Sequence, residues 1–289
     1  MKAHFISIEN SLKTWMEDRL EDIKGVLLDI DGVLTYGGHS ISGAPSFLEF
    51  LQAQKIPFFL VTNDGDHSPE EKSIILQACD ISIRPSQIIS CGHVIKDLVD
   101  KGSHHNQLFF VLGRLGAPCY AEIAGLRTTR QLEEISSCDG IIIGEREYDW
   151  ESYFNVVINR VIEMPQIPIW IPNPDIYCPR KGGGIQITAG AVGRFLTEIM
   201  SAYGIKISPV YLGKPFSHLF EIAYQQLCQI NDSFLSKKQI LFVGDLLAGD
   251  IKGAKDFGYF DILALTGVTS IKTLETSEIL PSLTVRSLT

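Results

Sequence analysis

Short apolar runs alternate with amphipathic segments along most of the chain. Eight runs are rich in β-branched and aromatic residues and have the length of buried strands: 26–30, 56–62, 108–112, 140–143, 168–171, 209–212, 239–243 and 262–265. The segments between them have one apolar face, as in 45–54, 150–163, 192–203, 217–228 and 248–257. This alternation predicts an α/β fold with a parallel sheet covered by helices on both faces.

Two local motifs refine this pattern. Ser68-Pro69-Glu70-Glu71 has a capping hydroxyl, a proline for the first helical position and a glutamate for the third, which predicts a helix start. Gly37-Gly38 follows the first predicted strand closely and predicts a tight hairpin there rather than a direct entry into a helix.

The length and composition predict a globular protein with two domains. The chain has 289 residues, of which 45% are hydrophobic and 20% charged. Its formal net charge is −9 and it has no block of Lys and Arg, which argues against a nucleic acid as the main partner. A small phosphate ligand stays compatible with this charge, because a local site can be positive on an acidic protein.

The cysteines and the length of the apolar runs indicate a cytoplasmic protein. The six cysteines lie far apart without a C-x-x-C pair, which suggests neither a zinc site nor a disulfide framework and fits a reducing compartment. The first 24 residues lack the apolar stretch of a signal peptide. Every apolar run is far shorter than the roughly 20 residues of a membrane span, so we expect no membrane association.

Two carboxylates follow the first predicted strand. Asp29 and Asp31 stand two residues apart at its end, with Gly32 directly after them. In an open α/β sheet, ligands bind at the carboxyl ends of the strands, so these side chains are candidates for chemistry. Acids at a solvated strand end are the simpler alternative, and the pair alone does not exclude it.

Three further strand ends carry polar groups in a fixed order along the chain. Thr62 and Asn63 end the second strand, Lys214 follows a short later strand, and Asp245 ends another with Asp250 five residues on. Each has an ordinary explanation by itself: a helix cap, a loop lysine or surface acids. Their joint occurrence at strand ends favours a single ligand site.

This order of motifs resembles the haloacid dehalogenase-like (HAD) phosphatase superfamily, and further segments resemble its class IIA, NagD-like branch. Those segments are 140–145, 148–150, 173–175, 190–191 and 265–270, and the resemblance extends from about residue 25 to residue 270. It implies a HAD-like doubly wound parallel sheet core formed by residues 1–105 and 206–289. An inserted α/β cap of the C2 type, residues 106–205, would be the lid that selects the substrate.

The resemblance implies an enzyme, a phosphoric monoester hydrolase. Asp29 would be the nucleophile that forms an aspartyl-phosphate, and Asp31 the general acid and then the general base. Lys214 would keep Asp29 ionised and bind the phosphoryl group. Thr62 and Asn63 would donate hydrogen bonds to the phosphoryl oxygens.

The resemblance also implies a Mg²⁺ cofactor in an all-oxygen site. Asp29, the carbonyl of Asp31 and Asp245 would bind the ion, and Asp250 would orient the site. The chain departs from the usual T-N-N motif at Asp64, whose carboxylate would repel a phosphate unless it were protonated or turned away.

The implied partner is a small phosphorylated metabolite, such as a sugar phosphate or nucleotide. In the cap, Asp175, Tyr177 and Cys178 fall in the loop that selects substrates in the family, although Cys178 also fits a small buried hydrophobic residue. Caps of this class often mediate dimers, which makes a homodimer through the cap an expectation. No residue identifies the substrate itself.

Other classes fit less well. A dinucleotide-binding enzyme would need G-x-G-x-x-G where Asp29-Ile30-Asp31-Gly32 stands, and a P-loop enzyme would need Ser or Thr where Pro215 follows Lys214. A phospho-receiver domain would be far shorter and would lack the second aspartate. A non-catalytic HAD scaffold that binds a phosphorylated ligand or a protein partner stays open as the alternative.

Overall fold

The computed structural model describes residues 8–179 and 184–289. The chain divides into two compact units. The first comprises the described residues up to Thr62, together with Lys72–Ile89 and Lys214–Thr289, and the second comprises Asn63–Glu71 and Ser90–Gly213. These units are defined by contacts, and the predicted boundaries of a cap at 106–205 stay a prediction.

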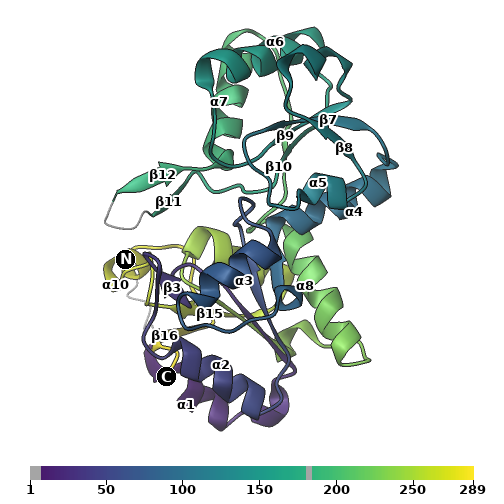
Figure 1. Cartoon of the computed structure of the whole chain (residues 1–289). Helices are drawn as coiled ribbons and strands as arrows, with labels where there is room; N and C mark the ends of the chain where they lie inside the picture. Colours follow the sequence, from purple (N-terminus) through teal and green to yellow (C-terminus); the bar gives the residue numbers. More distant parts are fainter. Residues whose placement is uncertain (1–7, 180–183) are drawn as a thin grey trace. The chain divides into compact units, whose positions relative to one another are not determined.

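A seven-stranded sheet forms the centre of the first unit (Figure 1). Its spatial order is β1 (Ile8–Ser11), β16 (Leu283–Ser287), β15 (Phe260–Ala264), β14 (Ile240–Gly244), β2 (Gly25–Leu28), β5 (Phe58–Thr62) and β6 (Ile88–Ser90). The pairs from β1 to β5 are all parallel. Leu28 is in register with both Val243 and Leu60, so the carboxyl ends of the three central strands coincide.

Helices cover both faces of this sheet. They are α1 (Leu12–Glu17), α2 (Ala44–Ala53), α3 (Pro69–Gln77), α8 (Ser217–Ile230), α9 (Lys252–Phe257) and α10 (Ile271–Glu275). Because side chains alternate along a strand, Val26 and Leu28 face the core shared with α1, α2 and α3. On the other face Phe242 packs against Phe220 of α8, with ring centroids 5.1 Å apart.

The two predicted local motifs are confirmed. The Ser68 hydroxyl accepts a hydrogen bond from the Glu71 N–H (3.2 Å), and the Glu71 carboxylate accepts one from the Ser68 N–H (2.8 Å), so α3 begins with a capping box. Residues 37–38 join β3 (Thr35–Tyr36) to β4 (His39–Ser40), and both glycines have positive φ.

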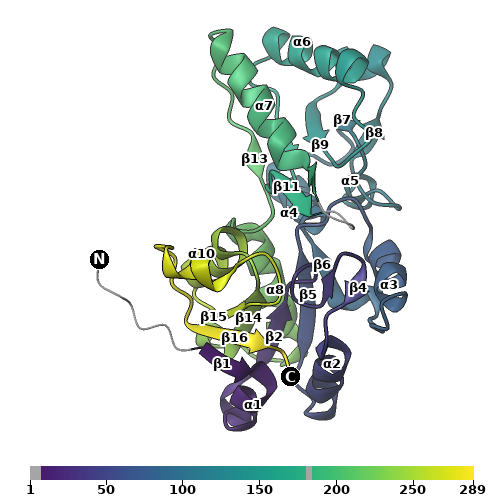
Figure 2. The ribbon, with the colours of Figure 1, turned by 90° about the vertical axis from the view of Figure 1, so that its left-hand side faces the viewer.

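The second unit contains a parallel five-stranded sheet. Its order is β13 (Val210–Tyr211), β10 (Ile169–Ile171), β9 (Gly140–Ile143), β7 (Leu108–Leu112) and β8 (Arg127–Thr129). Its helices are α4 (Val94–Gly102), α5 (Tyr120–Ile123), α6 (Asn155–Glu163) and α7 (Ala189–Ala202). Buried residues of α6 and α7 pack on one face of the sheet (Figure 2). A separate antiparallel hairpin joins β11 (Tyr177–Pro179) and β12 (Ile185–Ile187).

Each of the eight predicted strands corresponds to a strand of the two parallel sheets, and the α/β prediction is confirmed. Two predicted helices, 150–163 and 248–257, begin as π-helical turns, Trp150–Phe154 and Leu247–Ile251. Further short turns are Leu20–Asp22, Pro85–Gln87, Cys91–His93, Leu132–Ser137 and Lys237–Gln239.

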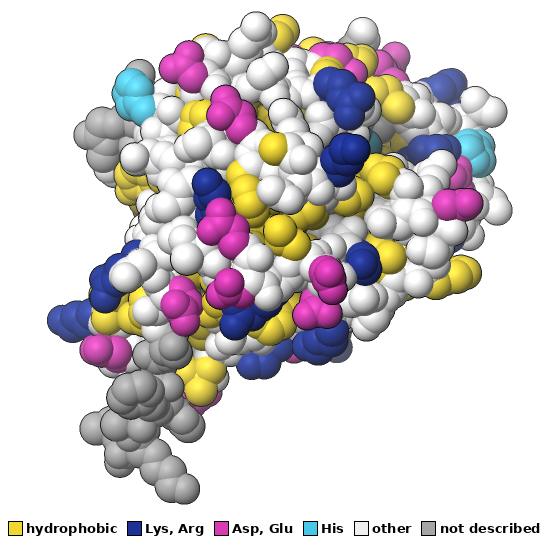
Figure 3. Space-filling view, turned by 90° about the horizontal axis from the view of Figure 1, so that it is seen from below, with side chains coloured by type: hydrophobic (Ala, Val, Ile, Leu, Met, Phe, Trp, Pro, Cys, Tyr) yellow, Lys and Arg dark blue, Asp and Glu magenta, His cyan; other side chains and the backbone are white. Residues whose placement is uncertain are grey.

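Two further features of the structure concern binding partners: the side chains on the surface and the lengths of the helices. On the face drawn in Figure 3, basic and acidic side chains are interspersed with hydrophobic ones. In the described part of the chain, no helix combines the length and the apolar character that crossing a bilayer requires.

Candidate active site

The candidate site lies where β2, β5 and β14 end side by side. Asp29 directly follows β2, Asp245 directly follows β14, and Thr62 is the last residue of β5. All three side chains are buried, with Asp29 8% and Asp245 3% exposed. Parallel pairing in this register explains why residues more than 200 positions apart meet at one edge.

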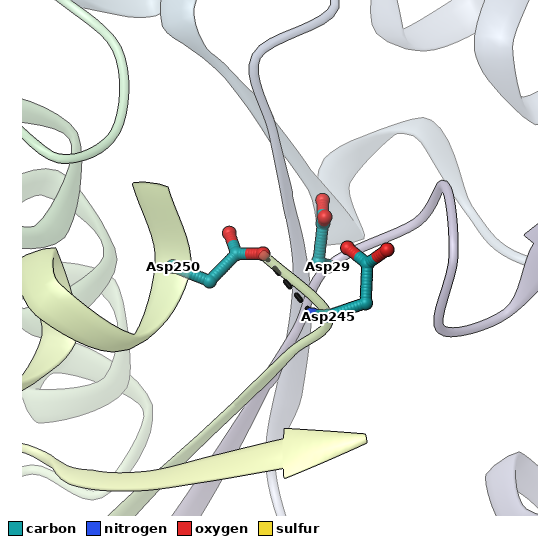
Figure 4. A group of neighbouring side chains, drawn as sticks. All are labelled: Asp29, Asp245 and Asp250. Carbon is teal, nitrogen blue, oxygen red and sulfur yellow. Dashed lines mark hydrogen bonds between the residues drawn. The ribbon is translucent and has the colours of Figure 1, made fainter. Parts of the chain in front are cut away.

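Asp29, Asp245 and Asp250 form a buried cluster of carboxylates (Figure 4). One oxygen of each lies within 4.8 Å of the others. Asp250 reaches back from the turn Leu247–Ile251, and its Oδ2 accepts hydrogen bonds from the N–H groups of Asp245 (3.1 Å) and Leu246 (3.0 Å). The structure therefore brings Asp250 to the backbone of the segment that carries Asp245.

Two glycines make room for the Asp245 carboxylate. A Cβ atom at Gly32 or Gly267 would overlap this carboxylate, and Gly32 also has a φ of +92°. The carboxylate accepts a hydrogen bond of 2.6 Å from the Val268 N–H, in the segment next to Gly267. Small residues on both sides thus leave space for a carboxylate at the sheet edge.

Lys214 provides the positive charge of the cluster. Its Nζ lies 2.7 Å from Oδ1 of Asp29 and 2.7 Å from Oδ1 of Asp250, and it donates to the Val61 carbonyl at 3.3 Å. Burial by itself would lower the pKa of Lys214, but the charges of Asp250 and Asp29 outweigh this effect and raise it. Lys214 is therefore a permanently charged ammonium in this site.

Burial, and after it the neighbouring carboxylates, raises the pKa values of Asp29 and Asp245. Burial is the main cause for Asp29, whose pKa is well above its ordinary value despite Lys214 and is raised further by Asp250 and Asp245. Burial and the charge of Asp250 raise the pKa of Asp245 to about 7. Three carboxylates against one ammonium leave negative charge that an added cation would balance.

The donor set fits a hard divalent cation. Carboxylate oxygens are the ligands that Mg²⁺ prefers, whereas zinc sites in proteins are built mostly from His and Cys. Within residues 8–179 and 184–289 this is the one group of three acidic, His or Cys side chains that meets the spacing for a metal site. We take Asp29 and Asp245 as the candidate side-chain ligands, because both oxygens of Asp250 already contact Lys214 and backbone N–H groups.

Asp31 has a different environment from Asp29. Its side chain is 66% exposed. Its Oδ1 accepts a hydrogen bond from the Thr35 hydroxyl (3.2 Å), and its Oδ2 lies 3.2 Å from Nζ of Lys72 on α3. The structure therefore places the Asp31 carboxylate in contact with Thr35 and Lys72.

Asn63 and Asp175 are brought together in the second unit. The Asn63 side-chain amide donates to Oδ2 of Asp175 at 3.1 Å, across 112 positions of sequence. The Asp175 N–H donates to the side-chain oxygen of Asn173 at 2.9 Å, and its carbonyl accepts a hydrogen bond from Thr188. Asp175 is thus fixed at both its backbone and its side chain.

Tyr177 and Cys178 lie on the exposed hairpin strand β11. Tyr177 is 43% exposed and Cys178 is also exposed. The interpretation of Cys178 as a small buried hydrophobic residue is therefore wrong, because all three residues of β11 are exposed. The exposure leaves both side chains accessible to solutes.

Asp64 is engaged by its own loop. Its Oδ2 lies 2.9 Å from Nδ1 of His67, and its Oδ1 accepts from the N–H groups of Asp66 (3.0 Å) and His67 (3.2 Å). These contacts occupy both carboxylate oxygens within the loop that follows β5.

Two notable residues were missed by the sequence analysis. Lys72 was not singled out because a lysine on an amphipathic helix normally faces solvent. Glu145 follows β9 and is 5% exposed, and burial raises its pKa to about 8 although a contact with Asn173 offsets part of the effect. An acid directly after a buried strand was the available signal for Glu145.

Comparisons with known proteins identify relatives along nearly the whole chain. A haloacid dehalogenase-like hydrolase model matches residues 26–127, and a HAD-hydrolase-like model matches residues 211–289. An acid sugar phosphatase of Staphylococcus haemolyticus is 26% identical over 269 residues, which cover 93% of this chain and 95% of the relative.

Solved structures agree with this likeness. A possible sugar phosphatase of the HAD superfamily from Cytophaga hutchinsonii is 26% identical, with a TM-score of 0.81 and 98% of each chain covered. NagD of E. coli K-12 is 22% identical with a TM-score of 0.76, covering 92% of this chain and 97% of NagD. A glycerol phosphate phosphatase of Mycobacterium tuberculosis in complex with magnesium is 21% identical with a TM-score of 0.77, covering 97% of this chain and 77% of that protein.

Proposed function

The chain belongs to the haloacid dehalogenase-like hydrolases, as a phosphatase of their class IIA branch, and from this premise we propose that it hydrolyses a small phosphate monoester with the aid of Mg²⁺. The names of its relatives favour a sugar phosphate over a nucleotide or another small ester. The observation that carries the proposal is the contact of 2.7 Å between Asp29 and Lys214, buried beside Asp245.

We assign the covalent chemistry to Asp29. Its carboxylate attacks phosphorus while the bond between phosphorus and the leaving oxygen breaks, and Asp31 gives its proton to that oxygen. Water then attacks the aspartyl-phosphate, Asp31 takes a proton from the water, and the bond between phosphorus and Asp29 breaks. Inorganic phosphate and the starting protonation states result.

Charge balance explains the neighbouring residues. Lys214 opposes the effect of burial on the pKa of Asp29 and, together with a bound cation, would favour its ionised form. Lys214 would also neutralise part of the phosphoryl charge, and Thr62 and Asn63 would donate hydrogen bonds to the phosphoryl oxygens. Mg²⁺, held by Asp29, Asp245 and the carbonyl of Asp31, would supply additional positive charge when bound. Asp250 fixes the segment of Asp245 through the backbone hydrogen bonds described above.

We propose that Asp175, Tyr177 and Cys178 contact the leaving group of the substrate. Asp175 is held by hydrogen bonds of its side chain and its backbone, and the other two side chains are exposed on the hairpin. Such contacts would rank substrates without changing the phosphoryl chemistry.

A panel of sugar phosphates, nucleotides and 4-nitrophenyl phosphate tests the proposal. We expect the parent protein with Mg²⁺ to release phosphate and a chelator to stop the release. Binding of a sugar phosphate without any release of phosphate from any ester would instead favour the non-catalytic scaffold.

A further inference from the structure

The carboxylate of Asp31 is exposed to solvent and yet held at both oxygen atoms. The two contacts come from different elements, Thr35 of β3 at 3.2 Å and Lys72 of α3 at 3.2 Å. An aspartate with 66% of its side chain exposed would otherwise sample several rotamers. The two contacts therefore restrict the rotamers of the Asp31 side chain, which would otherwise move freely in solvent.

Lys72 is placed against the usual pattern of an amphipathic helix. On α3 it is one of the two buried residues, together with Leu76 one turn later, and its own side chain is 9% exposed. The same helix exposes Ile74 by 69% and Ile75 by 40%. Burying an ammonium while exposing two isoleucines costs free energy, so this arrangement needs a reason beyond packing.

We propose that Lys72 is a positioning residue for Asp31, which it holds in the orientation needed to give a proton to the leaving oxygen. The inference rests on the proposed function, because it assumes that Asp31 acts as the general acid. In this role Lys72 acts through Asp31 and takes no part in the attack of Asp29 on phosphorus.

Substrates with different leaving groups distinguish a positioning role of Lys72 from a purely structural role. A sugar or glycerol alkoxide needs a proton as it departs, whereas 4-nitrophenolate is stable as an anion near neutral pH. Misplacing the general acid therefore slows alkyl phosphates more than 4-nitrophenyl phosphate. Damage to the fold or to the Asp29 site slows both substrates by the same factor.

The experiment measures kcat for glycerol phosphate and for 4-nitrophenyl phosphate at saturating Mg²⁺. For Lys72→Met we expect a loss of about 10- to 100-fold on glycerol phosphate and of about threefold or less on 4-nitrophenyl phosphate. Lys72→Arg keeps the positive charge and should restore part of the difference. Thr35→Val removes the second contact and should show the same preference more weakly, which covers the case that Lys72→Met does not fold.

Lys96→Met is the matched control. Lys96 and Asp100 also form a pair at 3.2 Å, but on the exposed surface of α4, so this variant should leave the ratio of the two rates unchanged. Equal losses on both substrates in Lys72→Met and Thr35→Val would overturn the inference. In that case the Asp31→Asn variant shows which assumption failed. A loss of kcat on glycerol phosphate that exceeds the loss on 4-nitrophenyl phosphate in Asp31→Asn leaves the proposed function intact. An inactive parent protein contradicts the proposed function itself.

Discussion

The two units each bury carboxylates, and they stabilise them in different ways. In the first unit, Asp29 and Asp245 lie with Asp250 around Lys214, which contacts two of the three acids. In the second unit, the buried Glu145 accepts a hydrogen bond from the Ala189 N–H and contacts Asn173, and the charged groups that act on its pKa are the carboxylates of Asp64 and Asp175. A bound cation would balance the negative charge of the first cluster, whereas a proton on its own carboxyl group neutralises Glu145.

The presence of a charged lysine among several acids distinguishes the candidate reaction site in the first unit from the buried acid Glu145 in the second. A raised pKa occurs in both places, to about 7 for Asp245 and to about 8 for Glu145, with burial as the main cause. The perturbation alone therefore does not identify the site. Several converging oxygen atoms and a charged lysine at the ends of adjacent strands do.

The largest effect should follow from changing the nucleophile. Asp29→Asn keeps the shape of the side chain but cannot attack phosphorus, so kcat should fall by about 10⁴-fold. Phosphate release from 4-nitrophenyl phosphate measures the loss, and circular dichroism checks the fold. Near-parental turnover in a folded variant would remove Asp29 from the reaction.

The next effect concerns stability and its dependence on pH. Because folding raises the Glu145 pKa from 4.5 to about 8, the folded state keeps a proton that the unfolded state loses. Stability should therefore fall as pH rises from about 4.5 to 8, by up to about 5 kcal/mol from this group, and level off above that range.

Glu145→Gln should remove this part of the pH dependence, because glutamine resembles the protonated acid and does not titrate. Urea unfolding at pH 5, 7 and 8.5 with saturating Mg²⁺ provides the measurement, and the difference between parent and variant isolates Glu145. Identical slopes in the two proteins would mean that Glu145 is ionised in the folded state.

A smaller effect is expected from the metal ligand. Asp245→Asn removes a charged oxygen from the cluster, so the Mg²⁺ concentration for half-maximal activity should rise by about 100-fold. Glu145→Gln serves as the control, with no change in the metal requirement. An unchanged metal requirement in Asp245→Asn would place the cation elsewhere.

The smallest effect should come from the hairpin. Tyr177→Ala should change the ranking of substrates by kcat/KM by about 1–3 kcal/mol while the metal requirement stays the same. A panel of phosphate esters measures the ranking. If the hydrolysis of every ester slows by the same factor, Tyr177 does not discriminate between leaving groups.

The sequence predicts the elements and the end of the sheet where the acids meet. Hydrophobic runs identify buried strands, and parallel pairing brings their carboxyl ends together, so Asp29, Thr62 and Asp245 could be placed in advance. The family resemblance added the expected role of each residue, which the spacing of the residues alone does not indicate. A homodimer through the cap stays a prediction.

Tertiary placement explains what the sequence does not predict. Lys72 is buried on a helix whose isoleucines are exposed, the reverse of the pattern on which helix faces are predicted. Cys178 lies on a strand of which every residue is exposed, in a local hairpin. The burial of Lys72 follows from packing between segments distant in sequence, whereas the exposure of Cys178 depends on how its short hairpin projects, and neither can be deduced from the local sequence pattern.

Calorimetry of Mg²⁺ binding tests most directly that the acids of the first unit form a cation site. Measured at pH 6 in buffers with different ionisation enthalpies, binding should release protons, because the Asp245 pKa of about 7 must fall when the cation arrives. Because the pKa of Asp29 is raised as well, the release should fall without vanishing in Asp245→Asn, and it should stay unchanged in Glu145→Gln. Binding that releases no protons, or a release that is undiminished in Asp245→Asn, would contradict the account.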